Sequence, residues 1–511
     1  MPETPAPSPT GRVPPATTAA TFAGRVLVLG LGGVSRCTLP LLFAHLPVPP
    51  SAYTVIDFAE VAADARWVTE RGATFVPGRV TRENYRDLLS AHLDRGDLLV
   101  DLAWNIGTLD LLEWCRGRGV RYVNASLELW DPYAEGWTQP TATRTLYARQ
   151  MDLRRQLASW GSNDGPTAVL DHGANPGLVS HFTKAALADV TAAWLAAAPV
   201  TGEEARRERA ASARDSRDWA GLARALDVQV IHISERDTQI SSEPKRVDEF
   251  VNTWSVEGFF EEGVAPAELG WGTHERTLPP GAAVHAEGPR NQIALARPGC
   301  RTWVRSWVPA GDIIGMVIRH GEAFSISDHL TVWEGAPVSS RALYRPTVHY
   351  AYCPTDAAIA SLHELQMRGY DLQAEQRVMA DDIVSGRDEL GVLLLGHPLT
   401  GWWTGSLLDI EETRRLVPHQ NATTLQVAAA VLAAVLWMVE NPSAGVRLPD
   451  ELPHEQILAW AAPYLGPVVS RQTDWTPLAG RVDPFAGYGV TPAPRPEDVW
   501  QFATFVVDGP G

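Results

Sequence analysis

A glycine-rich turn near the start of the chain has the residue types and the spacing of a dinucleotide-binding loop. Gly30, Gly32 and Gly33 directly follow a short apolar run and precede a helix-forming stretch, which is the setting that the dinucleotide fingerprint requires. Gly30 would allow the tight turn, and Gly32 would let a pyrophosphate approach the backbone amides at the positive end of the helix. This pattern predicts the binding of a nicotinamide dinucleotide.

Four further residues bear on how that cofactor would be held. Val34 and Ser35 continue the loop, and Ser35 replaces the usual third glycine with a side chain small enough to pack helix against strand. Asp57 closes the second apolar run, where an acidic side chain hydrogen-bonds the ribose diol and repels a 2′-phosphate, so NAD is predicted over NADP. Asn105 is expected at the carboxyl end of a strand that faces the cofactor crevice. The alternative is a glycine-rich turn that binds no ligand.

The elements that must position this loop alternate along the first part of the chain. Short apolar runs occupy residues 25–30, 52–60, 72–78, 96–105 and 119–128, and helix-forming stretches occupy residues 35–46, 81–93 and 108–119. This alternation predicts βαβ units and a parallel sheet. Farther along, we expect a charged helix at 202–226 and strands at 228–239, 302–309, 313–321 and 324–333. The predicted fold class is α/β, with an N-terminal Rossmann-like doubly wound parallel sheet and a second α+β domain.

Composition and charge argue against several functional classes. The formal net charge of −17 argues against a nucleic-acid partner and mildly favours cationic ligands. The four cysteines lack metal-ligand spacing, which predicts reduced cytoplasmic thiols and no metal site. Residues 1–20 lack the pattern of a secretory signal, so the glycosylation sequon at 421–423 carries no meaning. The apolar stretch 427–439 is too short to span a membrane, and we expect a buried helix there.

Several later stretches resemble bacterial homospermidine synthase far more specifically than the glycine loop does. They are residues 172–182, 232–239, 251–263, 267–275, 318–332 and 383–403. The resemblance runs from about Gly24 to beyond Arg415, and the cofactor domain of the family resembles that of saccharopine dehydrogenase. Ser35 departs from the family pattern, which more often has glycine there.

The resemblance implies an unusual use of NAD. The family joins two putrescine molecules into homospermidine and releases ammonia. NAD takes a hydride from the amine-bearing carbon of one substrate, the resulting imine exchanges its amine for the second putrescine, and the hydride then returns. The resemblance also implies a homodimer, and putrescine as the substrate, with spermidine as a further candidate.

Three of the residues that match family positions concern the cationic substrate most directly. Trp254 matches the family tryptophan expected to face the reactive ammonium or iminium, where a ring can contribute about 1–2 kcal/mol when desolvated; its alternative is core packing. Glu235 and Glu262 match family acids and suit either a counter-ion or a proton acceptor, and burial would raise the pKa of such a base. The alternative for each is a solvated or capping glutamate, and neighbouring Glu261 competes with Glu262.

Four more residues complete the predicted site. Asn175 precedes a proline at a sharp turn and would hold a substrate amine or the nicotinamide carboxamide, although an Asn that only satisfies the turn fits almost as well. His320 is assigned a proton-shuttling role, against the alternative of a hydrogen-bonded structural histidine. Glu128, beside the expected cofactor crevice, and Asp388 are further candidate partners for substrate amines.

The same observations divide the chain into four segments. They are a disordered tail at 1–22, an NAD-binding domain at 23–170, a catalytic and dimerisation domain at 171–410, and a helical and Pro-rich segment at 411–511 that packs on the core. Two rival functions remain open. An NAD(P)-dependent dehydrogenase of the saccharopine or opine type would need a basic cluster for an α-carboxylate, and none is convincing near the motif residues. A polyamine or NAD sensor would keep the site without catalysis.

Overall fold

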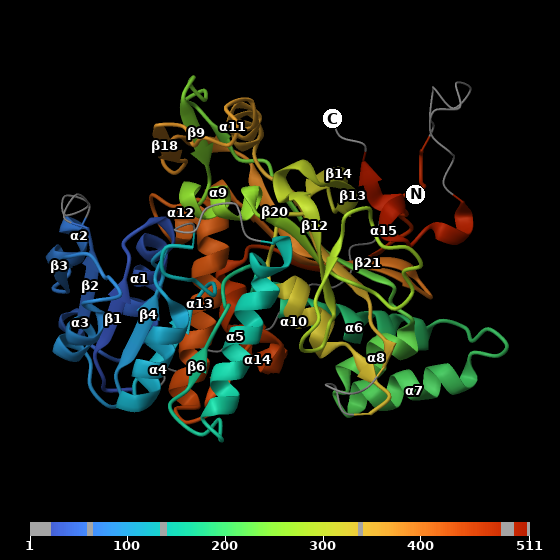
Figure 1. Ribbon diagram of the computed structural model, residues 1–511, viewed down its shortest axis with the longest axis horizontal. Helices are drawn as coiled ribbons and strands as arrows, with labels where there is room; N and C mark the ends of the chain where they lie inside the picture. The colour runs from blue at the N-terminus through green and yellow to red at the C-terminus, as the bar shows by residue number, and fades with distance from the viewer. Residues whose placement is uncertain (1–21, 59–64, 133–139, 336–340, 482–494, 508–511) are drawn as a thin grey trace.

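The computed structural model describes residues 22–58, 65–132, 140–335, 341–481 and 495–507 (Figure 1). The predicted disordered tail at 1–22 lies outside these ranges except for its last residue. Phe22 is 4% exposed and packs in the main hydrophobic core. Burial of an aromatic ring is strongly favourable, so Phe22 belongs to the folded domain and not to the tail.

The first sheet confirms the predicted doubly wound parallel arrangement. In the described residues its order is β22-β6-β5-β4-β1-β2-β3, and all neighbouring pairs are parallel. The strands are β1 (Val26–Leu29), β2 (Tyr53–Asp57), β3 (Thr74–Pro77), β4 (Leu98–Asp101), β5 (Arg121–Asn124), β6 (Ala168–Val169) and β22 (Val446–Arg447). The helices are α1 (Gly33–His45), α2 (Arg66–Glu70), α3 (Tyr85–His92), α4 (Thr108–Arg118) and α5 (Leu146–Ser159). Strand order reverses beside β1, and ligands bind at such a switch point.

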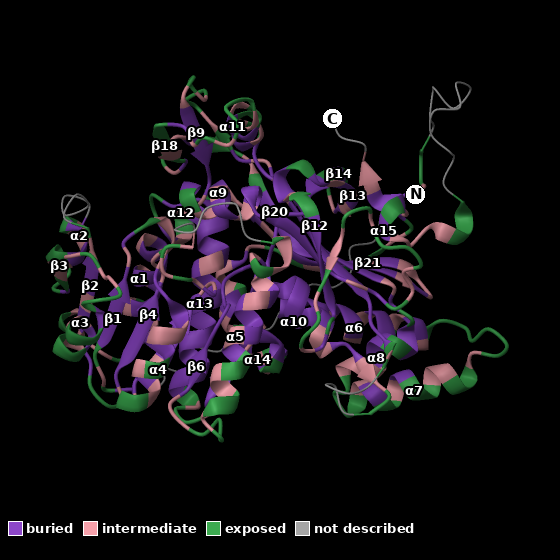
Figure 2. Ribbon diagram, viewed as in Figure 1, coloured by how far each residue is buried: buried purple, intermediate pink, exposed green. Residues whose placement is uncertain are grey.

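The second sheet is mixed and larger. Its main path runs β11-β12-β10-β17-β7-β20-β21-β23, with β13, β14 and β24 attached at the side. The strands are β7 (Val230–Asp237), β10 (Pro266–Gly270), β11 (Ala283–Val284), β12 (Gln292–Pro298), β13 (Trp303–Val308), β14 (Gly311–Met316), β17 (Thr347–Cys353), β20 (Arg387–His397), β21 (Thr400–Asp409), β23 (Val468–Thr473) and β24 (Val506–Val507). Within the described part of this sheet, only β7 and β17 pair in parallel, and Figure 2 shows the centre of the sheet buried.

The helices of the second half pack around this sheet. They are α6 (Leu178–Ala196), α7 (Glu204–Asp215), α8 (Trp219–Leu226), α9 (Val256–Val264), α10 (Gly321–His329), α11 (Asp356–Met367), α12 (Ile410–Leu416), α13 (Ala422–Glu440), α14 (His454–Ala461) and α15 (Phe502–Phe505). Helix α6 packs on β20 and β21, and α10 packs on β17. The predicted charged helix at 202–226 is broken into α7 and α8, because Arg217 between them has a positive φ of 57°.

One predicted strand is wrong. Residues 324–333 were expected to form a strand from their alternation, but most of this stretch belongs to helix α10, and only β15 (Val332–Trp333) is extended. Most side chains of α10 are buried, so its polar and apolar residues do not mark an exposed and a buried face. The alternation of polar and apolar residues therefore does not indicate a strand here. The neighbouring strand expected at 313–321 ends at Met316.

The last hundred residues contribute strands to both sheets. Strand β22 extends the parallel sheet, β23 extends the mixed sheet beside β21, and β24 pairs with β13. Helix α13 packs against α1 of the first domain and also against β20 and β21. The segment after residue 410 therefore joins the two sheets. None of these strands was predicted from the sequence. Strands β22 and β24 have two residues each and no periodicity to detect, whereas β23 has six residues with no alternation of buried and exposed positions.

Helix α13 is a core helix, as expected, but it is longer than the apolar stretch suggested. Within the described residues it is the helix long and apolar enough to cross a membrane by length and composition, and 94% of its most apolar window is buried inside the fold. The prediction that the segment is too short to span a membrane is therefore wrong. Burial against two sheets explains its apolar character.

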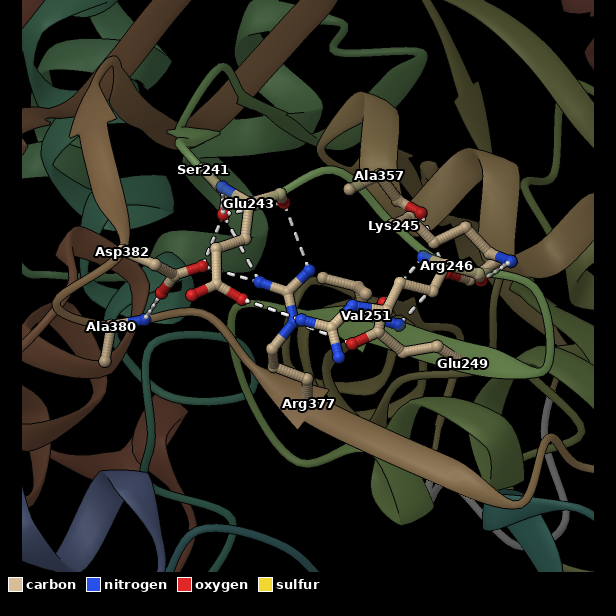
Figure 3. A network of polar contacts seen from close by, with 11 residues as sticks. Ser241, Glu243, Lys245, Arg246, Glu249, Val251, Ala357, Arg377, Ala380 and Asp382 are labelled. Atoms are coloured by element: carbon tan, nitrogen blue, oxygen red, sulfur yellow. Dashed lines mark hydrogen bonds and ion pairs between the residues drawn. The ribbon is translucent and has the colours of Figure 1, made fainter.

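A small outer lobe projects from the edge of the second half (Figure 1). It contains the parallel pair β9 (Glu249–Asn252) and β18 (Glu375–Val378), the pair β8 (Ile240–Ser241) and β19 (Ile383–Ser385), and α11; β15 pairs separately with β16 (Ala342–Tyr344). Arg377 braces the lobe by donating to Glu249 Oε1 at 2.8 Å and Asp382 Oδ2 at 2.6 Å (Figure 3). Strand β9 leads directly to Trp254.

Candidate active site

A cavity of about 1050 Å³ opens at the carboxyl ends of β1, β2 and β4. The glycine loop and the strand ends form one wall, and residues from α5, α9 and the segment before α10 form the other. The residues that line the cavity include Gly30, Gly32, Asp57, Asn105, Arg149, Glu261 and Arg319. Doubly wound sheets bind their ligands at this edge, beside the strand at which the order reverses.

The glycine loop has the geometry that a pyrophosphate needs. Gly30 has a φ of +85°, and a Cβ there would lie 3.1 Å from the carbonyl oxygen of Leu102, so the turn requires glycine. A Cβ on Gly32 would meet nothing within 4 Å, which leaves space above the start of α1. Helix α1 begins with no side-chain cap and no acidic residue in its first turn. Its first amides can therefore bind an anion.

The other three predicted loop residues lie behind this turn, in the first turn of α1, and do not line the cavity. A Cβ on Gly33 would lie 3.5 Å from Thr424 Cγ2. Ser35 is 1% exposed, and Val34 is half-buried. These positions fit a role in packing α1 rather than in touching a ligand.

Asp57 and Asn105 stand at the edge of the cavity where they were expected. The Asp57 carboxylate accepts hydrogen bonds from the backbone amides of Leu31 at 2.5 Å and Phe58 at 2.6 Å, so it ties the end of β2 to the glycine loop. Asn105 has a positive φ of 65° and exchanges two hydrogen bonds with Asp131. Both side chains thus have fixed orientations at the cavity rim.

Two arginines neutralise Glu261 on the opposite wall. Arg149 Nη2 lies 2.5 Å from Glu261 Oε1, Arg319 donates to the same oxygen, and Trp104 Nε1 donates to Oε2 at 3.2 Å. Burial would raise the pKa of Glu261, but the two guanidinium groups hold it below its usual range. Glu128 lies 3.9 Å from Arg149 Nη1, and burial, with the Glu261 charge adding, raises the pKa of Glu128 to about 7. Glu261 is therefore engaged in an ion-pair network and is poorly suited to accept a proton.

His320 and Glu262 form a separate pair. His320 caps the start of α10, and its Nε2 lies 2.9 Å from Glu262 Oε2, while its Nδ1 lies 3.4 Å from Glu322 Oε1. Burial would lower the pKa of His320, but the two carboxylates raise it well above its usual value. Glu262 keeps a quarter of its side chain exposed, so this pair has access to solvent. The two carboxylates therefore favour the protonated form of the imidazole.

Glu235 lies near the carboxyl end of β7 and is 2% exposed. Its Oε2 accepts a hydrogen bond from Asn175 Nδ2 at 3.0 Å and one from the Tyr350 hydroxyl. The ring of His320 packs edge-on against Tyr350 with centroids 4.4 Å apart. Burial raises the pKa of Glu235 to about 8. The charge of Asp237 also raises this pKa, whereas the hydrogen bond from Tyr350 lowers it. A carboxyl group with this pKa can take up and release protons near neutral pH.

Asp237 and Asp388 continue the acidic cluster across two strands. They are directly opposite each other in the antiparallel pair β7–β20, and the Thr423 hydroxyl lies 2.9 Å from Asp388 Oδ2. Burial raises the pKa of Asp237 to about 6. Burial, together with the charges of Glu235 and Asp237, raises the pKa of Asp388 well above its usual value. Within the described residues, none of these three buried carboxyl groups forms an ion pair with arginine or lysine, and such a cluster favours a cationic ligand.

Trp254 lies between β9 and α9, next to this cluster. Its indole Nε1 donates to the Tyr352 hydroxyl at 3.2 Å, and its ring packs against Phe259 with centroids 5.4 Å apart. Tyr352 pairs with Glu235 in the register of β17 and β7. The half-buried indole is therefore linked through Tyr352 to the strand pair that carries Glu235, and an aromatic ring attracts cations.

The sequence missed several members of this cluster. They are Asp237, Glu322, Tyr350, Tyr352 and Thr423. Asp237 follows Glu235 by two positions on one strand, and Tyr350 and Tyr352 have the same spacing, so each pair shares a face. That signal was available in the sequence. The approach of Thr423 depends on the packing of a distant helix and was not. Within the described residues, no group of three or more His, Cys, Asp or Glu side chains could hold a metal ion.

Known proteins match the chain over almost its whole length. Residues 26–169 match the saccharopine dehydrogenase NADP binding domain, and residues 173–473 match the saccharopine dehydrogenase C-terminal domain. The homospermidine synthase of Blastochloris viridis is 43% identical over 95% of this chain and 97% of its own length. The chain belongs to the homospermidine synthase family. The homospermidine synthase of Mesorhizobium japonicum is 40% identical over 95% of this chain and 97% of its own length.

A solved homospermidine synthase also has this fold. The crystal structure of the Legionella pneumophila enzyme in complex with NAD is 36% identical, covers 95% of this chain and 98% of its own, and superposes with a TM-score of 0.82. In the present member of the homospermidine synthase family, Glu235, Asn175 and Trp254 gather with Asp388 around the ends of β7 and β20. Glu262 and His320 lie beside them, and Glu128 stands apart in the arginine network.

Proposed function

We propose that this chain is an NAD-dependent homospermidine synthase that joins two putrescine molecules. The donor putrescine loses one amine nitrogen as ammonia, and an amine of the acceptor forms the new carbon–nitrogen bond, so no net oxidation occurs. The observation that carries the proposal is the buried acidic cluster of Glu235, Asp237 and Asp388 beside Trp254. Near-complete alignment with two homospermidine synthases supports it.

The charge of the site also separates the proposal from its first rival. A saccharopine- or opine-type dehydrogenase must bind an α-carboxylate, which needs a basic group. Of the six arginines that line the cavity, the two on the wall opposite the glycine loop next to Glu261, Arg149 and Arg319, are already paired with that carboxylate. Buried carboxylates would repel an amino acid carboxylate and attract an ammonium. The site is therefore better suited to a diamine than to an amino acid.

The residues of the chain divide the work of the reaction between them. The bound nicotinamide would accept a hydride from the donor and later return it. Trp254 faces the reacting ammonium or iminium and stabilises its charge. Glu235 accepts a proton from the donor amine before oxidation, and Asn175 holds its carboxylate in place. His320 and Glu262 supply and remove protons while ammonia leaves. Asp388 and Asp237 bind the distal ammonium group.

Asp57 is proposed to select NAD by binding the adenosine ribose. We expect Asp57→Asn to raise the dissociation constant of NAD by about tenfold, since a hydrogen bond to a charged group contributes about 1.5–3 kcal/mol. The same change should weaken the discrimination against NADP, because the carboxylate no longer repels a 2′-phosphate. Calorimetric titration with both dinucleotides checks this. An unchanged preference for NAD would remove Asp57 from the cofactor site.

The raised pKa of Glu235 predicts the pH dependence of catalysis. Because the pKa of Glu235 is about 8, its carboxyl is mostly protonated below about pH 8 and then can neither pair with an ammonium nor accept a proton. We therefore expect kcat/KM for putrescine to rise about tenfold between pH 7 and pH 9. The amine substrate contributes its own ionisation, so the same profile is measured for Glu235→Gln, in which the inflection near pH 8 should vanish. An identical inflection in both proteins would show that Glu235 is not the titrating group.

One assay separates the proposed activity from both rivals. The purified protein is incubated with putrescine and NAD, and ammonia, homospermidine and NADH absorbance are followed together. Equal amounts of ammonia and homospermidine without accumulation of NADH support the synthase. NADH formed in proportion to consumed amine indicates a dehydrogenase, and binding without any product indicates a sensor.

The homodimer rests on the family resemblance, and the cytoplasmic location rests on the spacing of the four cysteines. We infer a homodimer in the cytoplasm, with putrescine as the principal partner and neither nucleic acid nor a membrane involved. Light scattering on the purified protein tests the oligomeric state, and comparison of putrescine with spermidine as donor tests the substrate range.

A further inference from the structure

The first turn of α13 contacts three parts of the molecule that the proposed reaction must bring together. These are the loop that carries Trp254, the acidic cluster on β7 and β20, and the start of α1 behind the glycine loop. The turn consists of residues 421–424 and includes the glycosylation sequon at 421–423. Each of its three polar side chains has one of these contacts.

Asn421 has more hydrogen bonds than a helix cap requires. Its Oδ1 accepts the backbone N–H of Thr424 at 2.8 Å, which is the normal bond of an N-cap. Its Nδ2 donates to two carbonyl oxygens, that of Thr253 at 2.6 Å and that of Met379 at 2.7 Å. The residue is 2% exposed. The amide thus caps α13 and also fixes two other segments of the chain.

Those two carbonyls belong to the ends of the strands that carry the outer lobe toward the site. Thr253 follows β9 and immediately precedes Trp254, and Met379 follows β18. The two strands are parallel neighbours, and Arg377 braces their other side through Glu249 (Figure 3). Asn421 therefore holds the ends of β9 and β18 together by hydrogen bonds, directly before the chain reaches Trp254.

Thr423 reaches the acidic cluster from the same turn. Its hydroxyl lies 2.9 Å from Asp388 Oδ2 and 3.3 Å from Asp237 Oδ2. A hydroxyl has one proton, so it donates to one carboxylate at a time, and the shorter distance favours Asp388. The other oxygen of Asp388 has no hydrogen-bond partner in the described residues and is fully buried. Thr423 therefore fixes one oxygen and leaves the other for a ligand.

Thr424 completes the connection on the cofactor side. Its methyl group lies 3.5 Å from where a Cβ on Gly33 would be, and its hydroxyl donates to the backbone oxygen of Asn421 at 3.0 Å. Helix α13 is buried along almost its whole length between α1 and the mixed sheet. A rigid helix in this position fixes the acidic cluster on the mixed sheet relative to the start of α1 behind the glycine loop.

We propose that the first turn of α13 is a positioning element that sets Trp254 and Asp388 at a fixed distance from the dinucleotide loop. Asn421 and Thr423 are its two positioning residues; the catalytic part of this inference rests on the proposed function. Correct placement of reacting groups matters strongly, since an error of about 1 Å can lower a rate by about a hundredfold. A helix cap that serves stability alone would not need the contacts to Thr253 and Met379.

The variant Asn421→Asp separates positioning from capping. Asp caps helices as well as Asn does, so a residue that only caps would tolerate the change. The variant also replaces two donors with an acceptor that faces two carbonyl oxygens. We expect kcat to fall at least tenfold and KM for putrescine to rise, while the dissociation constant of NAD stays within about twofold. We also expect faster amide hydrogen exchange confined to residues 249–258 and 375–380.

Two controls fix the interpretation. Asp218→Ala removes the N-cap of α8, far from the site, and should lower the melting temperature without changing kcat. Thr423→Val removes the hydroxyl and should lower kcat/KM about tenfold, whereas Thr423→Ser should restore it. This second pair decides the question if Asn421→Asp does not fold.

The outcomes are distinguishable from failure of the proposed function. Wild-type kinetics and wild-type hydrogen exchange in Asn421→Asp would overturn the positioning role, as would equal activity of the Thr423→Val and Thr423→Ser variants. If the wild-type protein makes no homospermidine, the proposed function fails, and hydrogen exchange near Trp254 still decides whether Asn421 positions this loop.

Discussion

Replacement of Glu235 by Gln is expected to lower kcat for homospermidine formation by about a hundred- to ten-thousandfold, the range that general base catalysis supplies. Gln keeps the size of the side chain and can still bond to Asn175 and Tyr350, but it cannot accept a proton or balance an ammonium. The affinity for NAD should stay the same, because Glu235 lies on β7 and outside the glycine loop. Steady-state kinetics at a saturating NAD concentration measure the effect.

A neighbouring glutamate provides the matched control. Glu389 on β20 is also 2% exposed and lies on the mixed sheet, but it pairs with Arg236 in the strand register and accepts the N–H of Ala310. Glu389→Gln should therefore leave kcat unchanged. If both variants lose activity to the same extent, the loss reflects the buried charge in general, and Glu235 has no special role.

Replacement of Trp254 by Leu is expected to abolish most turnover while NAD binding survives. The change removes the aromatic face beside the acidic cluster and the hydrogen bond from the indole to Tyr352. A cation–π contact contributes about 2 kcal/mol when desolvated, and its loss in the transition state corresponds to about thirtyfold in rate. Lost positioning adds to this, so we expect a decrease of about a hundredfold. Single-turnover kinetics and NAD titration measure the two quantities separately.

The aromatic character of residue 254 can be tested within the same series. Trp254→Phe keeps a weaker aromatic face and should retain more activity than Trp254→Leu. Trp160→Leu is the matched control. Trp160 follows the last residue of α5, and its indole also donates a hydrogen bond, to Glu113 in α4, so its loss should leave turnover unchanged. Undiminished turnover in Trp254→Leu would remove this residue from the mechanism.

The sequence predicted the first sheet well and the rest of the fold only in part. Strands β1 to β5 were each predicted, because apolar runs bounded by glycines and separated by helices have a clear pattern. Strand β22 was missed, because two residues have no pattern and their partner lies nearly three hundred positions earlier. Helix α10 was mistaken for a strand, because burial on all sides removes the difference between helical and extended periodicity.

The site followed the same division between local pattern and long-range packing. Gly30, Gly32 and Asp57 could be placed from spacing alone, since one loop and one strand end define them. Trp254, Glu235 and His320 came from the family resemblance, and the structure brings them together from segments far apart in the chain. The choice between Glu261 and Glu262 depended on Arg149 and Arg319, whose positions no local pattern predicts.

In the proposed reaction, bound NAD would take a hydride from the substrate and return it to the same molecule before the product leaves. The most direct test supplies putrescine deuterated on both amine-bearing carbons, with NAD and an excess of unlabelled NADH in solution. If the hydride returns within the same complex, we expect mass spectrometry to show homospermidine that retains every deuteron. Homospermidine that has lost one deuteron per molecule to the dissolved NADH pool would contradict it.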